Sequence, residues 1–308
     1  MKVCFFGLGS IGERHLINLK KMSKLFDLEL TIHSFRSSER KIAATIESLI
    51  NKQIYDRNDL EFYDLIFITN PTAFHYEEIK SNIKNCHSMF IEKPLFNSTK
   101  YDLSGLNLKQ NSIYYVACPL RYNPVVEYLK TFVNNQKIFS GRCICSSYLP
   151  EWRNGTDYRN TYSAKRELGG GVSLDLIHEI DYITYLFGFP VKLNVVSKRY
   201  SNLEIDSDDL SVYFIEYQDK LIELHLDYFG RFKQRKIEIY TENDVIIGDL
   251  ITNRITFLKS GNELIFNDND MYINEMKYFL EYFLNGKKTF NEIDYAFRIL
   301  KMSQGEMI

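Results

Sequence analysis

Short apolar runs alternate with amphipathic segments along the first third of the chain. Residues 2–6 read as a strand, and residues 11–25 follow as a helix with core positions Ile11, Leu16, Leu19 and Met22. Further strands are predicted at residues 28–35, 63–70, 87–91 and 112–120, and further helices at residues 39–50 and 72–84. Strands that alternate with helices at this spacing predict βαβ units and a parallel, doubly wound sheet.

The pattern changes near residue 137, where strands follow one another directly. The predicted strands occupy residues 138–149, 191–201, 209–229, 236–250 and 255–266. One helix interrupts them at residues 172–187, and two more follow at residues 272–284 and 291–302. We therefore expect an α/β protein with a parallel-sheet domain over residues 1–120. An α+β domain with a large, mostly antiparallel open sheet should follow over residues 121–308, and its last helix could pack back on the first domain.

Composition excludes several classes of protein. The 308 residues carry a net charge of -2, which gives no reason to expect nucleic acid or an anionic membrane surface as a partner. The first apolar stretch is short and runs into glycines and charges, so it resembles neither a signal peptide nor a membrane span. Five cysteines without a framework spacing suit a reducing cytoplasm. Cys143 and Cys145 share one face of a predicted strand, and we interpret them as core residues, with no metal site.

A glycine-rich turn, "FFGLGSIGERH", joins the first strand to the first helix. Gly7 permits the tight turn, Gly9 lets the backbone approach a pyrophosphate, and Gly12 lets helix and strand pack closely. The helix N-terminus then presents N–H groups and partial positive charge to the phosphates. This context favours a Rossmann dinucleotide site over a chance glycine turn. The residues expected to bind the cofactor here are Gly7, Gly9, Ser10, Ile11 and Gly12.

The end of the second strand bears on the choice of cofactor. An acidic residue there would hold the ribose 2′-hydroxyl of NAD, but the chain has Ser34 and Phe35. Arg36 and Ser37 follow, with Ser38 and Arg40 close behind, and a guanidinium with hydroxyls suits a 2′-phosphate. Ser34, Arg36 and Ser37 are therefore expected to favour NADP over NAD. In the alternative interpretation, Ser38 caps the next helix and the arginines are solvated.

The segment "SMFIEKPLF", residues 88–96, interrupts an apolar run with charges. Alone it would be an ordinary solvated strand end, since Glu and Lys are mostly surface residues. After a strand of a parallel sheet, however, Glu92 and Lys93 fall at the carboxyl edge, where such sheets bind ligands. Pro94 restricts the backbone of Lys93 to an extended form, and the bond between them is a candidate cis peptide.

A second cluster, "ELGGGVSLDLIHEIDYITYLFG", places three glycines before a predicted helix. Asp175, His178 and Asp181 recur at steps of three and are expected on one helical face. A lone helical histidine is more often a satisfied core residue than a catalyst. Carboxylates one turn before and after it favour an acid/base role, because they orient imidazole and stabilise its charged form. Metal binding would need a second His or Cys at ligand spacing.

In this order along nearly the whole chain, these motifs resemble the Gfo/Idh/MocA oxidoreductases, the glucose–fructose oxidoreductase and inositol dehydrogenase family. The resemblance rests on the glycine turn, "TNPTAFHYEEI", "FIEKPL", "LRYNPVVEYLK" and the GGG helix. It implies a Rossmann domain followed by an α/β domain whose open sheet forms oligomer contacts. A homodimer or homotetramer through that sheet is therefore expected.

The resemblance also implies roles for individual residues. The segment with Thr69, Asn70, Pro71 and His75 would run beside the nicotinamide half of the cofactor. Glu92 would face the nicotinamide ribose, with Lys93 between cofactor and substrate. Arg121, Tyr122 and Asn123 would enter the substrate pocket, and Asp175 and His178 would supply acid/base chemistry. Many members space these last two as Asp-x-x-x-His, whereas here two residues separate them, which leaves the share of Asp175 in substrate binding open.

The segment before the GGG helix, residues 148–171, lies where family members place a loop over the active site. Aromatic faces stack on sugar rings or bases, and cations bind carboxylate or phosphate. We expect substrate contacts from Trp152, Arg153 and Tyr158, in a loop that also holds Asp157, Arg159, Tyr162 and Lys165. An ordinary ordered loop that packs one Trp is the equal alternative. The segment is similar to a branch of the family in surface-sugar biosynthesis, which implies an acidic or nucleotide-linked sugar.

The predicted function is reversible hydride transfer between nicotinamide and a secondary alcohol or ketone of a sugar-like substrate, in the cytoplasm. His178 would be the general base, since an imidazole pKa of about 6.5 suits that work near neutrality, and Lys93 would stabilise charge on the same oxygen. Two alternatives stay open: a non-enzymatic dinucleotide-binding regulator or scaffold, and a reductase of imines or conjugated substrates. The regulator would have no chemical need for both Lys93 and His178.

Overall fold

The computed structural model describes residues 1–267 and 270–307. They form two compact units, Met1–Ala117 with Tyr272–Phe297, and Cys118–Met271 with Arg298–Ile308. The predicted first boundary at residue 120 lies near the observed one. The predicted extent of the second domain differs from the structure, because residues 272–297 belong to the first unit.

The first unit contains a parallel six-stranded sheet in the order β3-β2-β1-β4-β5-β6. Its strands are β1 (Lys2–Phe6), β2 (Thr31–Phe35), β3 (Lys52–Ile54), β4 (Tyr63–Ile68), β5 (Cys86–Ile91) and β6 (Tyr114–Val116). Its helices are α1 (Ser10–Leu25), α2 (Ala44–Glu47), α3 (His75–Asn82), α7 (Met271–Leu284) and the start of α8 (Ile293–Ser303). The strand order reverses direction beside β1, and ligands bind at such a switch point in doubly wound sheets. The predicted Rossmann architecture is confirmed.

Stacked aromatic rings form the centre of this unit. Phe5 of β1 stacks on Phe67 of β4 with ring centroids 4.4 Å apart, and Phe67 lies 5.1 Å from Phe90 of β5. Phe279 of α7 then packs edge-on against Phe90 at 5.2 Å and lies 5.5 Å from Tyr115 of β6. These contacts explain why a helix from the end of the chain belongs to the first unit.

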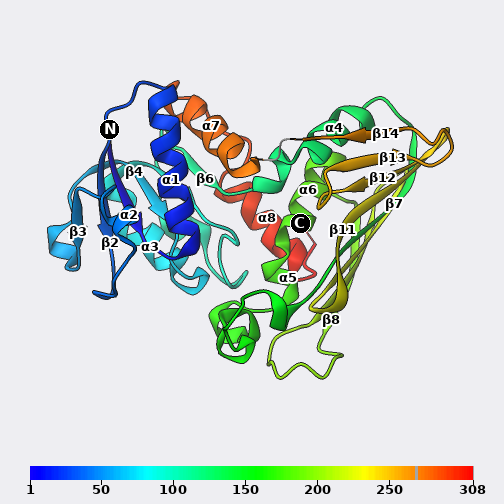
Figure 1. Ribbon diagram of the computed structural model, residues 1–308, viewed down its shortest axis with the longest axis horizontal. Helices are drawn as coiled ribbons and strands as arrows, with labels where there is room; N and C mark the ends of the chain where they lie inside the picture. The colour runs from blue at the N-terminus through cyan, green and yellow to red at the C-terminus, as the bar shows by residue number, and fades with distance from the viewer. Residues whose placement is uncertain (268–269, 308) are drawn as a thin grey trace. The chain divides into compact units, whose positions relative to one another are not determined.

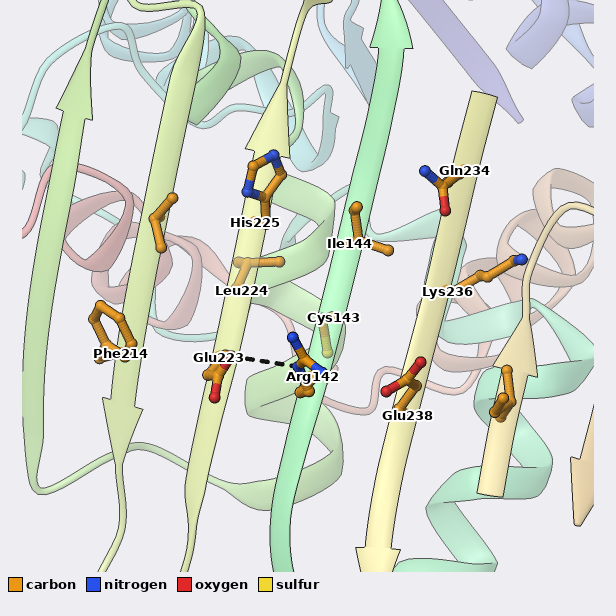
Figure 2. A pocket seen from close by; sticks show the side chains of 12 residues that line it. Arg142, Cys143, Ile144, Phe214, Glu223, Leu224, His225, Gln234, Lys236 and Glu238 are labelled. Carbon is orange, nitrogen blue, oxygen red and sulfur yellow. Dashed lines mark ion pairs between the residues drawn. The ribbon is translucent and has the colours of Figure 1, made fainter. Parts of the chain in front are cut away.

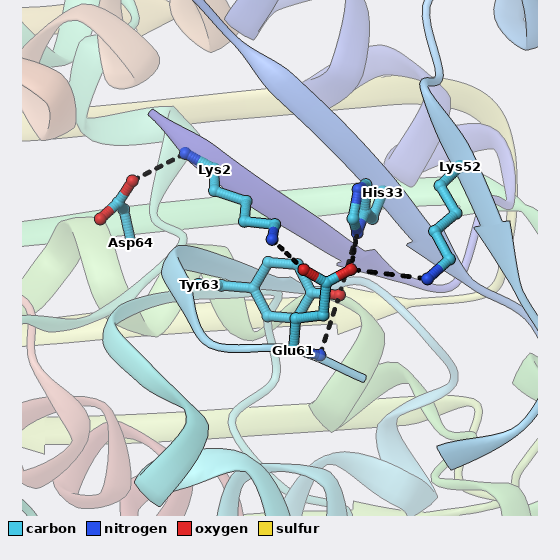
Figure 3. Close-up of polar contacts among 6 residues, drawn as sticks. All are labelled: Lys2, His33, Lys52, Glu61, Tyr63 and Asp64. Carbon is cyan, nitrogen blue, oxygen red and sulfur yellow. Dashed lines mark hydrogen bonds and ion pairs between the residues drawn. The ribbon is translucent and has the colours of Figure 1, made fainter. Parts of the chain in front are cut away.

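A network of polar side chains lies at the edge of the same sheet where its strands begin (Figure 3). The half-exposed carboxylate of Glu61 pairs with Lys2 at the start of β1 and lies 3.5 Å from the ammonium of Lys52 at the start of β3. His33 lies 3.9 Å from the same carboxylate and 3.1 Å from the hydroxyl of Tyr63. Charges here tie the strand starts together, while the functional motifs follow the strand ends.

The second unit contains an eight-stranded sheet in the order β14-β13-β12-β11-β7-β10-β9-β8. Only β7 and β10 pair in parallel among its described ladders, so the predicted, mostly antiparallel sheet is confirmed. The strands are β7 (Ile138–Tyr148), β8 (Lys192–Lys198), β9 (Leu210–Glu216), β10 (Leu221–Asp227), β11 (Phe229–Thr241), β12 (Val245–Asp249), β13 (Arg254–Phe257) and β14 (Glu263–Ile265). Helices α4 (Pro124–Val133), α5 (Val172–Asp175) and α6 (Ile177–Phe187) lie together against one face (Figure 1).

Two helix predictions are wrong, for different reasons. The helix predicted at residues 39–50 shrinks to α2, because the Arg36 guanidinium donates to the Arg40 carbonyl and holds the preceding segment as a loop. The helix predicted at residues 172–187 is broken at Leu176, whose φ of -98° and ψ of 22° separate α5 from α6. Asp175 and His178 therefore lie on different helices and do not share a continuous face.

All five cysteines are buried thiols without a disulfide. Cys143 and Cys145 point from β7 into the core, as predicted, and burial raises the pKa of Cys145 to about 12. Within residues 1–267 and 270–307, no helix is both long enough and apolar enough to cross a membrane.

Candidate active site

The glycine turn after β1 is built by close backbone approach. Gly7 has φ +97°, and a Cβ there would lie 2.8 Å from the Asn70 backbone. A Cβ on Gly12 would lie 2.4 Å from the Gly7 carbonyl oxygen. Thr69 completes the junction by donating its hydroxyl to that same oxygen at 2.6 Å. Fold geometry alone therefore requires two of the three glycines, and Thr69 fixes the turn.

Gly9 differs from these two, since no atom lies within 4 Å of its ideal Cβ position. Protein packing does not require a glycine here, whereas the approach of a pyrophosphate does. Gly9 is the N-cap of α1 and makes no side-chain cap bond, which leaves the first-turn N–H groups of Ser10, Ile11 and Gly12 for an anion. The buried Oδ1 of Asn70 also has no hydrogen-bond partner in the described chain. These features fit a dinucleotide.

The three residues predicted to bind a 2′-phosphate differ in their exposure to solvent. Ser34 is fully buried in β2, and its hydroxyl is unreachable from the surface. Arg36 lies at the strand end, where its guanidinium donates to Gln53 at 2.6 Å and to the Tyr55 hydroxyl at 3.3 Å. Ser37 is exposed beside it. Arg36 is itself buried, with its guanidinium also bound to the Arg40 carbonyl, so Ser37 is the exposed one of the three residues. Binding of a 2′-phosphate by these residues stays a prediction.

The Lys93–Pro94 bond is cis, as proposed from the sequence, and Lys93 is partly exposed at the end of β5. The Glu92 carboxylate pairs with the Nε2 of His15 from α1 and accepts the Lys93 N–H at 3.1 Å. Burial alone would raise the pKa of Glu92, but the His15 hydrogen bond and charge and the Lys93 charge outweigh it and lower the pKa. Lys93 is thus anchored next to the helix that begins at the glycine turn.

His75 and Pro71 occupy the segment after β4. Pro71 is exposed, whereas His75 is buried with its ring between the carbonyl oxygens of Asn70, at 2.9 Å, and Leu95, at 3.1 Å. The predicted role of His75 was contact with the cofactor. In the structure both ring nitrogens face backbone of the protein itself.

In the second unit, the glycines before α5 permit close approach to neighbouring segments. A Cβ on Gly170 would lie 2.2 Å from the Tyr162 carbonyl oxygen, and one on Gly171 would lie 2.3 Å from Oδ1 of Asp208. The Asp208 carboxylate accepts the Ser173 N–H at 2.9 Å. The loop at residues 161–165 and the segment before β9 are thereby held against the start of α5.

Each carboxylate near His178 is bound by a partner from another segment. Tyr228 donates its hydroxyl to Asp175 at 2.5 Å, and Glu179 lies 2.9 Å from Nε of Arg235. Asp181 accepts two bonds from Arg121, at 2.8 and 2.7 Å. Asp181 is therefore engaged by Arg121, and its expected orientation of His178 stays a prediction. His178 itself is half-buried in the first turn of α6.

Hydroxyl groups surround Asp175. Burial raises the pKa of Tyr162, and the Asp175 charge and hydrogen bond raise it further. Burial also raises the pKa of Tyr228, and the charge of Asp175 and the hydrogen bond to it act in the same direction. Both phenols therefore stay protonated, and the bond from Tyr228 fixes the carboxylate at the C-terminal residue of α5. Asp175 is thereby held at the junction of α5 and α6, three residues before His178.

The segment predicted to enter the substrate pocket, residues 121–123, is buried. The bidentate pair occupies Nε and Nη2 of Arg121, and Asn123 caps α4 by accepting the Val125 N–H at 2.9 Å. The side chain of Tyr122 is also almost inaccessible. Substrate contact by these three residues stays a prediction. Within the unit, Arg121 holds α6 through Asp181, and Asn123 caps α4.

The loop after β7 is ordered by its own contacts. Trp152 packs edge-on against Tyr228 with ring centroids 5.2 Å apart and donates its indole N–H to Ser147 at 2.9 Å. The Tyr158 hydroxyl accepts the Glu204 N–H at 3.1 Å. Asp157 and Glu204 pair with Arg159, while exposed Arg153 lies over the Tyr162 ring. Arg153 is thus the better placed of the two arginines to meet an anion.

Sequence reasoning missed three residues of this architecture, namely His15, Tyr228 and Glu179. A signal existed for His15, because it is four residues from both Ile11 and Leu19 and so lies on the predicted core stripe of α1. A polar residue on an apolar stripe needs a partner. Tyr228 and Glu179 gave no local signal, since their partners lie 53 and 56 positions away in the chain.

The Arg121–Asp181 pair provides a direct test of the anchor. Arg121→Met removes one partner and leaves a buried carboxylate uncompensated, which should lower the free energy of unfolding by about 3 to 5 kcal/mol. The double variant Arg121→Met/Asp181→Leu should recover most of that loss, because both charges are gone. Urea unfolding followed by circular dichroism measures both. Equal stability of Arg121→Met and the unmodified protein would contradict the role.

Comparison with known proteins agrees with this architecture. A model described as "Oxidoreductase family, NAD-binding Rossmann fold" matches residues 1–102, and the model of the C-terminal alpha/beta domain of the same family matches residues 148–245. The uncharacterized oxidoreductase YrbE of Bacillus subtilis (strain 168) is 28% identical over 196 residues. That match covers 60% of this chain and 53% of YrbE, or about half the length of the relative.

Solved structures share the fold over 99% of the chain. They include a levoglucosan dehydrogenase in complex with NADH and levoglucosan (TM-score 0.84, 16% identity, 95% of that chain covered). Myo-inositol 2-dehydrogenase from Lactobacillus plantarum has a TM-score of 0.78 at 20% identity, with 95% of its chain covered. UDP-N-acetylglucosamine 3-dehydrogenase GnnA from Acidithiobacillus ferrooxidans has a TM-score of 0.77 at 17% identity, again with 95% covered. With both domain models matched in order, the chain belongs to the Gfo/Idh/MocA oxidoreductase family.

Proposed function

We propose that the chain is an NAD(P)-dependent oxidoreductase that acts on a secondary alcohol or ketone of a sugar-like substrate. The observation that carries the proposal is the anchoring of Lys93. Through Glu92 and His15, the lysine is tied to the helix whose N-terminus fits the pyrophosphate. An ammonium at this edge can hold a substrate oxygen and stabilise negative charge that develops on it.

Each proposed role belongs to a named residue of this chain. His178 removes the hydroxyl proton when the alcohol is oxidised and returns it when the ketone is reduced. Lys93 holds the same oxygen, and Asp175 fixes the start of the helix that carries His178. The dinucleotide accepts or supplies the hydride. The named ligands and activities of the similar dehydrogenases support a sugar or polyol, and exposed Arg153 supports one with an anionic group.

The Lys93→Met variant tests this function. Levoglucosan, myo-inositol and UDP-N-acetylglucosamine should be included in a panel of sugars and sugar acids, followed by absorbance at 340 nm. Loss of the ammonium should reduce turnover at least about 100-fold while dinucleotide binding persists. Full activity of Lys93→Met would refute the mechanism. Tight dinucleotide binding without turnover on any substrate would favour a regulator, and an active His178→Ala variant would favour imine or conjugated-substrate reduction.

We further propose a preference for NADP. No acid stands at the end of β2, and Arg36 is held there by Gln53 and Tyr55 beside exposed Ser37. Arg36→Gln should weaken NADPH binding relative to NADH binding by about 10- to 100-fold, since one charge-assisted contact is lost. The ratio of the two dissociation constants, from fluorescence titration, cancels general damage to the fold. Lys41→Gln, an exposed cation on the same loop, is the matched control. An unchanged ratio in Arg36→Gln would refute the assignment.

We also propose that the face of the second sheet opposite α4 and α6 pairs with a second copy of the chain. Figure 2 shows its side chains, where Arg142 and Glu223 form an ion pair and Lys236 and Glu238 stand nearby. Alternating charges suit an isologous contact, in which each residue meets its counterpart's neighbours. Phe214 and Val196 are 43% and 51% exposed there, which gives such a contact apolar area.

Light scattering coupled to gel filtration tests the pairing. The unmodified chain should run as a dimer or tetramer, and Phe214→Arg should reduce the mass towards that of a monomer, because a desolvated, unpaired charge opposes association. Leu25→Arg, at an exposed apolar position of α1, should leave the mass unchanged. A monomeric unmodified chain would contradict the proposal.

A further inference from the structure

Two buried histidines flank the turn that carries Lys93. His15 comes from α1 and His75 from α3, and their exposed fractions are 0% and 1%. His15 pairs with Glu92, directly before the lysine, and His75 lies 3.1 Å from the carbonyl oxygen of Leu95, two residues after it. The turn is therefore held on both sides, by side chains that cannot reach solvent.

The contact on the His15 side is a short relay to the lysine backbone. One oxygen of Glu92 meets Nε2 of His15, and the other accepts the Lys93 N–H. The His15 ring packs against Phe90 with centroids 4.8 Å apart, so its position is fixed by the core of the sheet. Its Nδ1 has no hydrogen-bond partner in the described chain. For stability alone, an apolar pair of similar volume would serve as well as this polar one.

The contact on the His75 side joins two loops at the carboxyl edge. Its two nitrogens face the carbonyl oxygens of Asn70 and Leu95, which can only accept. Burial lowers the pKa of His75, although the two carbonyls and the charge of Glu92 act in the opposite direction. The ring is thus neutral near pH 7 and donates to one of the two. Whichever carbonyl accepts, the buried ring lies between the segment after β4 and the segment after β5.

We propose that His15 and His75 are positioning residues that fix the backbone from which Lys93 reaches its substrate. This inference rests on the proposed oxidoreductase function for its catalytic meaning. Neither histidine touches the reacting atoms. Lysine has a long, flexible side chain, so the place of its ammonium depends on the backbone beneath it. A displacement of about 1 Å at a reacting group can cost about 100-fold in rate.

The test compares variants that break each contact with variants that restore a donor. His15→Phe and His75→Phe keep ring volume and remove the hydrogen bonds, whereas His15→Gln and His75→Gln keep an N–H donor. The first readout is the rate at which Lys93 is acetylated by acetic anhydride, measured by peptide mass spectrometry relative to exposed Lys21 in the same sample. We expect the Phe variants to change the Lys93 rate several-fold and the Gln variants to approach the unmodified protein.

The second readout separates positioning from simple loss of structure. In the Phe variants, kcat should fall about 100-fold while the KM for the dinucleotide changes little, because Gly9 and the α1 N-terminus are intact. If a Phe variant is unfolded by circular dichroism, the Leu variant of the same histidine replaces it, since leucine is smaller than phenylalanine and likewise removes the hydrogen bonds. An unchanged Lys93 acetylation rate in a folded variant, or equal loss of kcat and dinucleotide affinity, would overturn the proposal.

These readouts also distinguish failure of the inference from failure of the proposed function. Acetylation of Lys93 needs neither substrate nor turnover, so it reports on the two histidines even if no sugar reacts. Altered acetylation without turnover in any protein would refute the oxidoreductase function and keep the positioning role. If the unmodified protein turns over a substrate but Lys93 acetylation is unaltered in the variants, the oxidoreductase function stands and the positioning role is refuted.

Discussion

The first unit depends on the approach of the turn after β1 to the end of β4. Gly7 and Gly12 leave room for backbone where a Cβ would clash, and Thr69 closes the junction through its hydroxyl. This contact sets where α1 begins, and α1 in turn carries His15 to the end of β5. His15 in turn binds Glu92, which accepts the N–H of Lys93. The geometry of the proposed catalytic lysine thus originates in glycines more than eighty residues earlier in the chain.

In the second unit, the proposed general base, His178, lies close in the chain to three acidic residues. Asp175, Glu179 and Asp181 all lie within three residues of His178. Unpaired, three buried carboxylates this close in the chain would repel one another. Tyr228, Arg235 and Arg121 bind them one by one, from β11 and the segments next to β11 and α4. The charges that surround His178 are therefore used to fix two short helices in place.

Local chemistry explains which parts the sequence could predict. The strand–turn–helix with its glycines, the alternating strands and the cis peptide before Pro94 depend on neighbouring residues, and all are observed. The prediction of a helix at residues 39–50 was wrong because the Arg36 guanidinium binds a backbone carbonyl of the loop that follows it. The partner of Asp181 could not be predicted, because helical spacing shows which residues share a face but not which distant side chain meets that face. Arg121, sixty positions away, decides that contact.

Buried polar pairs are a poor source of net stability, because desolvation offsets much of their attraction. In this chain the pairs of Glu92 and Asp175 adjoin Lys93 and the start of the His178 helix, while the amino-terminal edge uses the exposed carboxylate of Glu61. A pair that adds little stability still restricts geometry, since its members lose hydrogen bonds whenever they move. Rigidity is thereby concentrated around the two residues proposed for the chemistry, which is what catalysis by fixed, preorganised groups requires.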